Sequence, residues 1–297
     1  MASPSTVHAH LATLERALAA RGIRSTAIIM PPGEKTKSYQ HLAELCDKLL
    51  AAGQQAVSMS RFRPNIVLGN APGQQAVVAH QADLGIAFDG DGDRVIMVDH
   101  LGNVVDGDEI LYVLARQRQL TGSLRGPVVG TVMSNFGLQQ AFEKLGIPFE
   151  RAAVGDRYVL ERLRASNGVV GGETSGHTIC LDRSRTGDGI VTALQVLEAM
   201  LMRKQTLAEL VGDVSKLPQV LLNVPVTGKA KPLLDDPAVK AVAQGVEASL
   251  VGRGRLLLRA SGTEPVVRVM VEATEHAVAV EAAERLAETV RAAAAAR

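Results

Sequence analysis

Apolar and polar residues along the chain follow two spacings, one typical of helices and the other of strands. Apolar residues recur at helical spacing over residues 6–20 and 38–53, which predicts two amphipathic helices ending at Gly22 and Gly53. The apolar run at 25–30 predicts a short strand between them. Residues 60–73 hold prolines and glycines close together and therefore indicate a boundary or linker.

From residue 74 onwards, helical and strand patterns alternate. The apolar run at 83–88 predicts a buried strand that leads directly into an acidic loop. Strands are also predicted over 95–99, 126–132 and 169–181, and helices over 74–82, 109–119, 137–146, 157–166 and 189–205. This alternation predicts an α/β protein.

The end of the chain has a different order. Strands are predicted first, over 217–226, 256–261 and 266–273, and an Ala-rich helix then closes the chain over 277–297. Apolar residues of that helix recur at helical spacing, which favours a packed helix over a disordered tail. They are Val280, Ala283, Leu286, Ala287 and Val290. We therefore expect a small α+β C-terminal domain.

Composition narrows the classes of protein to consider. The 297 residues are 46% hydrophobic and carry a formal net charge of +1, so we expect a globular protein that binds neither nucleic acid nor a membrane. The start of the chain has no signal-peptide pattern, and no apolar run approaches the roughly 20 residues that span a bilayer. Cys46 and Cys180 form no disulfide or metal-ligand pattern. A cytoplasmic protein is expected.

The acidic loop is the first candidate site. Asp89, Asp91 and Asp93 alternate with glycines, which permit a tight backbone path that can direct three carboxylates at one centre. Hard oxygen ligands favour Mg²⁺, Mn²⁺ or Ca²⁺ over zinc. An EF-hand loop is excluded, because its sixth residue should be Gly and is Arg94, and its twelfth should be Glu and is His100. An exposed acidic turn is the alternative.

Two further motifs carry polar groups. Glu173, Ser175 and His177 stand at alternate positions and would share one side of an extended segment, where they could hydrogen-bond sugar hydroxyls or an amine. A second motif lies between two apolar strands and combines guanidinium groups, hydroxyls and a glycine turn, which suit phosphate. Its residues are Arg259, Ser261, Gly262, Thr263 and Arg268. The alternatives are an ordinary polar turn and an ordinary hairpin.

The order and separation of the three motifs resemble the α-D-phosphohexomutase superfamily, and its phosphoglucosamine mutase family in particular. Segments such as DLGIAFDGDGDRVIMVD, AVGDRYVLERL, TGDGIVTALQVLEAM and LLRASGTEPVVRVMVE carry this resemblance, from about Gln75 to Arg297. It implies α/β domains with mixed sheets of the phosphohexomutase type. It also implies four segments: residues 1–74 unlike the family, a partial second domain at 75–103, a third domain at 104–217 and a C-terminal domain at 218–297.

The resemblance also implies roles for the motif residues. Asp89, Asp91 and Asp93 would bind Mg²⁺, and Arg94 would lie beside the transferred phosphoryl group. The motif at 173–177 would hold the sugar, and the motif at 259–268 would hold the phosphate that is not transferred. Arg157 and Asp188 match further family segments. The partner implied is a small sugar phosphate, converted between glucosamine 6-phosphate and glucosamine 1-phosphate through a bisphosphate. Whether the chain forms a homo-oligomer stays an open question.

The N-terminal part departs from this family. The family's phosphoserine loop, of the T-A-S-H-N-P type, does not occur in the sequence, and Ser58 and Ser60 have unlike neighbours. Residues 17–53 instead resemble a fragment of 3-dehydroquinate synthase, with Glu34 and Lys37 in its GExxK pattern. We therefore expect impaired turnover by this chain alone. The alternatives are a catalytically silent protein that binds sugar phosphate and Mg²⁺, and a dinucleotide-binding module at the N-terminus.

Overall fold

A computed structural model describes the chain in six stretches. They are Arg16, Ala19, and residues 24–26, 65–69, 74–261 and 264–296. Arg16 and Ala19 are helical, whereas the helix expected over 38–53, together with Cys46, Glu34 and Lys37, lies outside the described residues. The described residues form two compact units. The first comprises those up to Ser134 and Ala141–Val214, and the second comprises Asn135–Gln140 with those from Ser215 onwards.

The first sheet of the first unit has five strands in the order β1-β2-β3-β4-β5. β1, β2 and β3 are parallel, and β4 and β5 continue the sheet in antiparallel fashion. Their bounds are β1 Arg24–Thr26, β2 Asn65–Gly69, β3 Leu84–Phe88, β4 Val95–Asp99 and β5 Val104–Val105. The short helix α3, Gln74–Ala79, connects β2 to β3.

The prediction of a boundary or linker over residues 60–73 is wrong for residues 65–69. Residues 65–69 form β2, which pairs with β1 on one side and with β3 on the other. Gly69 is the last residue of this strand, a position in which glycine commonly marks a strand end.

The second sheet of the first unit has four strands in the order β7-β6-β8-β9. β6 is parallel to β7 and β8, and β9 is antiparallel to β8. The strands are β6 Val128–Thr131, β7 Phe149–Ala152, β8 Val170–Gly172 and β9 Thr178–Cys180. The helices that accompany them are α4 Gly107–Leu120, α5 Phe136–Lys144, α6 Asp156–Ser166, α7 Gly189–Arg203 and α8 Leu207–Val211. Residues of α5 from Ala141 onwards belong to this unit.

Helix α4 shows how the sequence sets these elements. Asp106 accepts hydrogen bonds from the first backbone N–H groups of the helix, while the Glu109 side chain accepts from the Asp106 N–H. This capping box satisfies donors that have no partner inside the helix. Ile110, Leu111 and Leu114 are fully buried, so the helix packs by its apolar face.

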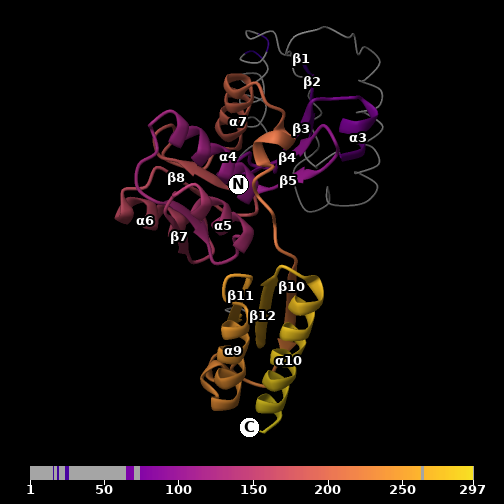
Figure 1. The fold of residues 1–297 in the computed structure, drawn as a ribbon, viewed down its shortest axis with the longest axis vertical. Helices are drawn as coiled ribbons and strands as arrows, with labels where there is room; N and C mark the ends of the chain where they lie inside the picture. The colour runs from indigo at the N-terminus through magenta and orange to yellow at the C-terminus, as the bar shows by residue number, and fades with distance from the viewer. Residues whose placement is uncertain are drawn as a thin grey trace. The chain divides into compact units, whose positions relative to one another are not determined.

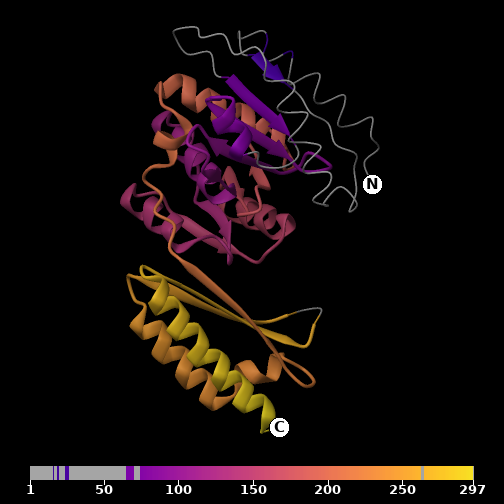
Figure 2. The same cartoon turned by 90° about the vertical axis from the view of Figure 1, so that its right-hand side faces the viewer.

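The second unit is a small α+β domain. Its antiparallel sheet has the order β10-β12-β11, and α9 and α10 lie side by side on one face of it (Figures 1 and 2). The strands are β10 Gln219–Pro225, β11 Gly254–Ala260 and β12 Val266–Ala273, and the helices are η2 Lys231–Asp235, α9 Pro237–Ser249 and α10 His276–Ala295. The α/β class with mixed sheets and the α+β C-terminal domain are thus confirmed.

The closing helix α10 packs as the sequence predicts, whereas α9 was not predicted. Ala283, Leu286, Ala287 and Val290 are fully buried against the sheet, and Val280 is half-buried. Helix α9 begins with Pro237 after the cap residue Asp236, whose carboxylate accepts hydrogen bonds from Ala238 and Val239. Asp followed by Pro is a helix-start signal, so the sequence did contain the information.

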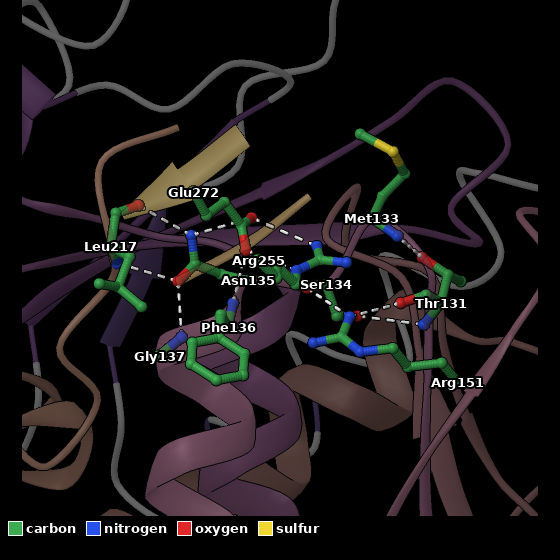
Figure 3. Close-up of polar contacts among 10 residues, drawn as sticks. All are labelled: Thr131, Met133, Ser134, Asn135, Phe136, Gly137, Arg151, Leu217, Arg255 and Glu272. Atoms are coloured by element: carbon green, nitrogen blue, oxygen red, sulfur yellow. Dashed lines mark hydrogen bonds and ion pairs between the residues drawn. The ribbon is translucent and has the colours of Figure 1, made fainter. Parts of the chain in front are cut away.

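A buried carboxylate organises one end of this sheet (Figure 3). Glu272 of β12 is fully buried and pairs with Arg255 directly across the ladder, with 2.7 Å between Glu272 Oε2 and Arg255 Nε. Its carboxylate also accepts hydrogen bonds from the Phe136 N–H at 2.9 Å and the Asn135 side chain at 3.4 Å. The start of α5 is thereby fixed to the C-terminal sheet.

Among the described residues, no helix combines the length and the apolar character that crossing a bilayer requires.

Candidate functional site

The acidic loop joins the buried strand β3 to β4 in the first unit. Residues 89–94 lie between two antiparallel strands whose register pairs Phe88 with Val95, so the loop is a tight connection at the end of a hairpin. Gly92 has a φ of +75°, a backbone conformation that side chains disfavour. Gly92 therefore permits the backbone path that brings the carboxylates together.

The three aspartates converge as the sequence predicts. One carboxylate oxygen from each of Asp89, Asp91 and Asp93 lies within 4.8 Å of the other two. Asp91 is exposed, while Asp89 and Asp93 are half-buried. Three carboxylates at this separation repel one another unless a proton or a cation intervenes.

The pKa values of two of these groups are shifted in opposite directions. The pKa of Asp89 is raised to about 6 by burial, by its hydrogen bond with Asp93 and by repulsion from both neighbouring carboxylates. For Asp93, burial acts to raise the pKa, but the hydrogen bond with Asp89 and the attraction of His177 outweigh it and lower the pKa. Asp89 therefore holds a proton more readily than Asp93 in the absence of a cation.

This donor set fits Mg²⁺. All three side chains offer hard oxygen ligands, which Mg²⁺ prefers. Asp93 Oδ1 is buried and has no hydrogen-bond partner among the described residues, so one acceptor is left for a cation. A divalent cation would also relieve the repulsion that raises the pKa of Asp89.

Arg94 is the last residue of the acidic loop. Its backbone N–H donates to Asp89 Oδ1 at 3.2 Å, and its side-chain Nε lies 3.9 Å from Asp89 Oδ2 and 4.0 Å from Asp93 Oδ1. Half of the side chain remains exposed. The guanidinium group therefore stands beside the carboxylates and is still accessible to a negatively charged ligand.

The segment around Glu173, Ser175 and His177 is a turn, so the extended segment considered for this motif is not formed. It connects β8 to β9, with hydrogen bonds from Glu173 N to His177 O and from Gly176 N to Glu173 O, both 2.9 Å. We call residues 173–177 the sugar turn, after the role that the resemblance implies for them. Glu173 and Ser175 stay together at its tip, with Ser175 Oγ 3.4 Å from Glu173 Oε2. His177 separates from them and is buried.

The sugar turn contacts the acidic loop and the elements beside it. Val95 N donates to Gly176 O at 3.2 Å, and Gly107 N donates to Thr174 O at 3.1 Å. The side chains meet where His177 Nδ1 lies 3.0 Å from Asp93 Oδ2. A Cβ on Gly176 would stand only 2.2 Å from Val95 O, so this approach requires glycine.

The start of α7 supports the acidic loop from another side. Asp188 caps the helix by accepting a hydrogen bond from Val191 N at 2.9 Å, and Gly189 N donates to Gly92 O at 2.9 Å. A Cβ on Gly189 would lie 2.6 Å from Arg94 O. Asp188 thus fixes a helix that contacts the loop. Arg157, at the start of α6, forms an exposed ion pair with Glu161 instead.

The phosphate motif lies in the second unit, on the hairpin between β11 and β12. Arg259 and Arg268 are directly opposed across the two strands, and Ser261 N donates to Val266 O at 2.8 Å. Gly262 and Thr263 lie outside the described residues. We call residues 259–268 the arginine hairpin.

The two opposed arginines repel each other. Burial and repulsion by Arg268 lower the pKa of Arg259. Arg268 Nη2 donates to Glu264 at 3.3 Å, but its buried Nε has no partner among the described residues. Like charges directly opposed on a sheet are destabilising, and a phosphate would remove that cost while accepting from both guanidinium groups.

Sequence reasoning missed the glycines that hold these segments together. Gly107, Gly176 and Gly189 each approach the backbone of another element closely. Their positions beside the motifs were visible, but the partner backbones come from distant parts of the chain.

Two sequence models of one protein family match the chain. The model described as phosphoglucomutase/phosphomannomutase, alpha/beta/alpha domain III, matches residues 106–217. The model described as phosphoglucomutase/phosphomannomutase, C-terminal domain, matches residues 221–289. The first range includes the sugar turn, and the second includes the arginine hairpin.

Individual proteins agree with these matches. The phosphoglucosamine mutase of Alkalilimnicola ehrlichii is 60% identical over 218 residues, which cover 73% of this chain and 48% of that protein. The chain spans about half the length of the curated relatives it matches.

Solved structures share the fold. A phosphoglucomutase/phosphomannomutase family protein from Burkholderia thailandensis matches with a TM-score of 0.62 and 25% identity, over 74% of this chain and 48% of that chain. The N-acetylphosphoglucosamine mutase of Aspergillus fumigatus, crystallised with GlcNAc-6P and magnesium, matches with a TM-score of 0.57 and 24% identity, over 71% of this chain and 49% of that chain.

Proposed function

Because the chain belongs to the phosphoglucomutase/phosphomannomutase family, we propose that it carries the Mg²⁺, sugar and phosphate contacts of a phosphoglucosamine mutase. That enzyme interconverts glucosamine 6-phosphate and glucosamine 1-phosphate through a bisphosphate. The substrate proposed for this chain is accordingly a small amino-sugar phosphate, and the compartment is the cytoplasm.

The observation that carries the proposal is the junction between the acidic loop and the sugar turn. Two backbone segments far apart in sequence are joined by the hydrogen bond from Val95 to Gly176 and by the contact between His177 and Asp93. An isolated acidic turn needs no such support. A centre that must bind a metal and a sugar together does need it, because a group displaced by about 1 Å loses much of its catalytic effect.

Each part of this site then has a chemical task. Asp89, Asp91 and Asp93 would hold Mg²⁺, which supplies positive charge against the negative charge of a phosphoryl group. Arg94, half exposed beside them, would donate to phosphoryl oxygens. Glu173 and Ser175 at the tip of the sugar turn would accept from or donate to sugar hydroxyls and the amine.

The arginine hairpin has a task of its own. Arg259 and Arg268 would bind the phosphate of a sugar phosphate, which offsets their repulsion. Because this hairpin is a local feature of one unit, its affinity for phosphate should not depend on the acidic loop.

The absence of a T-A-S-H-N-P-like loop favours a second candidate function. A mutase needs a covalent phosphoryl carrier, and neither Mg²⁺ nor the arginine hairpin substitutes for a nucleophile. A protein that binds sugar phosphate and Mg²⁺ without turnover is therefore the alternative for this chain acting alone.

The metal assignment is tested by titrating Mg²⁺ calorimetrically into the wild type and into an Asp91→Asn, Asp93→Asn double variant. We expect one Mg²⁺ site in the wild type, lost in the double variant, and a thermal stabilisation by Mg²⁺ that only the wild type shows. A Glu284→Gln, Glu288→Gln double variant removes two exposed carboxylates of α10 and is the charge-matched control. Equal binding by all three proteins would refute the assignment.

A further inference from the structure

The side chains of the arginine hairpin lie on the face of the C-terminal sheet opposite to the one on which α9 and α10 pack. Val267 and Val269 of β12 are fully buried in the core that the two helices complete (Figure 2). Successive side chains of a strand point to opposite faces of the sheet, so Arg268 points away from the helices. Residues directly opposite Arg268 on the neighbouring strands share this second face.

These opposite residues are Arg259 on one side and Asn223 on the other. The strand register pairs Arg268 with Arg259 of β11, and it pairs the same Arg268 with Asn223 of β10. Residues paired in this way have Cβ atoms about 5 Å apart. Asn223, Arg268 and Arg259 therefore form one row across all three strands, which we call the cross-strand row.

The row contains side-chain donors without acceptors. Asn223 is exposed, and its side chain has no hydrogen-bond partner in the described part of the chain. The buried Nε of Arg268 beside it has none there either. An asparagine amide offers two N–H donors and carries no charge. Asn223 thus adds donors next to the two arginines without adding a third positive charge to their mutual repulsion.

We propose that Asn223 is a third phosphate-binding residue, whose side-chain amide donates to the phosphate held by Arg259 and Arg268. The inference rests on the phosphate role proposed for the arginine hairpin and deepens it. Arg268 is the middle residue of the row, so a phosphate bound to it lies within reach of both neighbours. Phosphate oxygens accept several hydrogen bonds, and one guanidinium group satisfies only part of them. The site then extends from the hairpin to β10.

The test compares dissociation constants for glucosamine 6-phosphate and for inorganic phosphate, measured by calorimetry, with thermal unfolding as a check on folding. Asn223→Ala should weaken binding of both by about tenfold, the lower end of the range for a hydrogen bond to a charged group. Asn223→Asp should weaken it further, because a carboxylate repels the phosphate and pairs with Arg268. Gln219→Ala is the matched control and should change neither constant. Gln219 is an exposed amide on the same face of β10, but it stands opposite Glu272.

A second measurement detects the contact itself. The ¹H–¹⁵N signals of the Asn223 side-chain amide, assigned by their loss in Asn223→Ala, should shift when inorganic phosphate is added, and those of Gln219 should not. Wild-type protein that binds neither ligand would refute the phosphate role of the arginine hairpin and the inference with it. Binding that is weakened by Arg259→Ala and unchanged by Asn223→Ala would overturn the role of Asn223 alone.

Discussion

At the scale of single residues, the sequence predicted which groups would meet only where they are neighbours in the chain. Asp89, Asp91 and Asp93 converge because two glycines separate them, and that spacing is visible in the sequence. The contact between His177 and Asp93 joins residues 84 positions apart and depends on how β4 and the sugar turn align. Local spacing carries no information about such an alignment.

The raised pKa of Asp89 predicts that this carboxylate favours metal binding but lowers the stability of the metal-free protein. Its folded-state pKa of about 6 exceeds the ordinary value of 3.8, so the ionised group is disfavoured in the folded protein. The free energy of unfolding of the metal-free protein should fall as the pH rises through this interval. Asp89→Asn should therefore stabilise the metal-free protein at pH 7, with an advantage that shrinks as the pH falls from about 6 towards 4.

Thermal unfolding in chelator at several pH values measures this effect. Mg²⁺ binding by Asp89→Asn should at the same time be weaker, because one ligand oxygen carries less charge. If the wild type and the variant gave parallel stability profiles between pH 4 and pH 7, Asp89 would not be the group that carries the repulsion.

At the scale of helices and strands, amphipathic patterns located most elements, and tertiary pairing decided the rest. Helices α4, α7 and α10 lie where apolar residues recur at helical spacing. β2 was mistaken for a linker because its pairing with β1 and β3 involves residues distant in sequence. α9 was missed although Asp236 and Pro237 signal its start. Whether a short segment next to Pro and Gly forms a strand depends on the strands with which it pairs.

The buried contacts of Glu272 predict that replacing this residue lowers the free energy of unfolding of the C-terminal unit strongly. Glu272→Ala would remove the carboxylate that pairs with the mostly buried Arg255 and that accepts from the N–H of Phe136. Breaking a buried ion pair by removing one partner costs about 3–5 kcal/mol. We expect a loss of this size in the free energy of unfolding, measured with denaturant.

Two variants make that measurement specific. Glu272→Gln keeps an acceptor oxygen for the Phe136 N–H and should cost less than Glu272→Ala. Glu275→Ala removes an exposed carboxylate three residues along the chain and should change the free energy of unfolding by no more than about 0.5 kcal/mol. A loss in Glu272→Ala no larger than in Glu275→Ala would show that the buried cluster contributes little.

At the scale of the whole molecule, the chain forms two compact units, to which the proposed function assigns different ligand contacts. The family models match residues 106–217 and 221–289, which confirms the resemblance inferred from the motifs. The acidic loop at 89–94 precedes both ranges, so its assignment to Mg²⁺ depends on the convergence of its carboxylates and on its bonds to the sugar turn. The division of the chain at residues 74, 103 and 217 stays a prediction.

Binding of glucosamine 6-phosphate, followed by calorimetry, tests the central claim most directly. Arg259→Ala should weaken it by roughly 1.5–3 kcal/mol, or about 10- to 150-fold, since a hydrogen bond to a charged group is lost. Arg285→Ala, which removes an exposed arginine of α10 in the same unit, should leave the dissociation constant unchanged. A wild-type protein that does not bind glucosamine 6-phosphate, or an Arg259→Ala variant that binds it as the wild type does, would contradict the account.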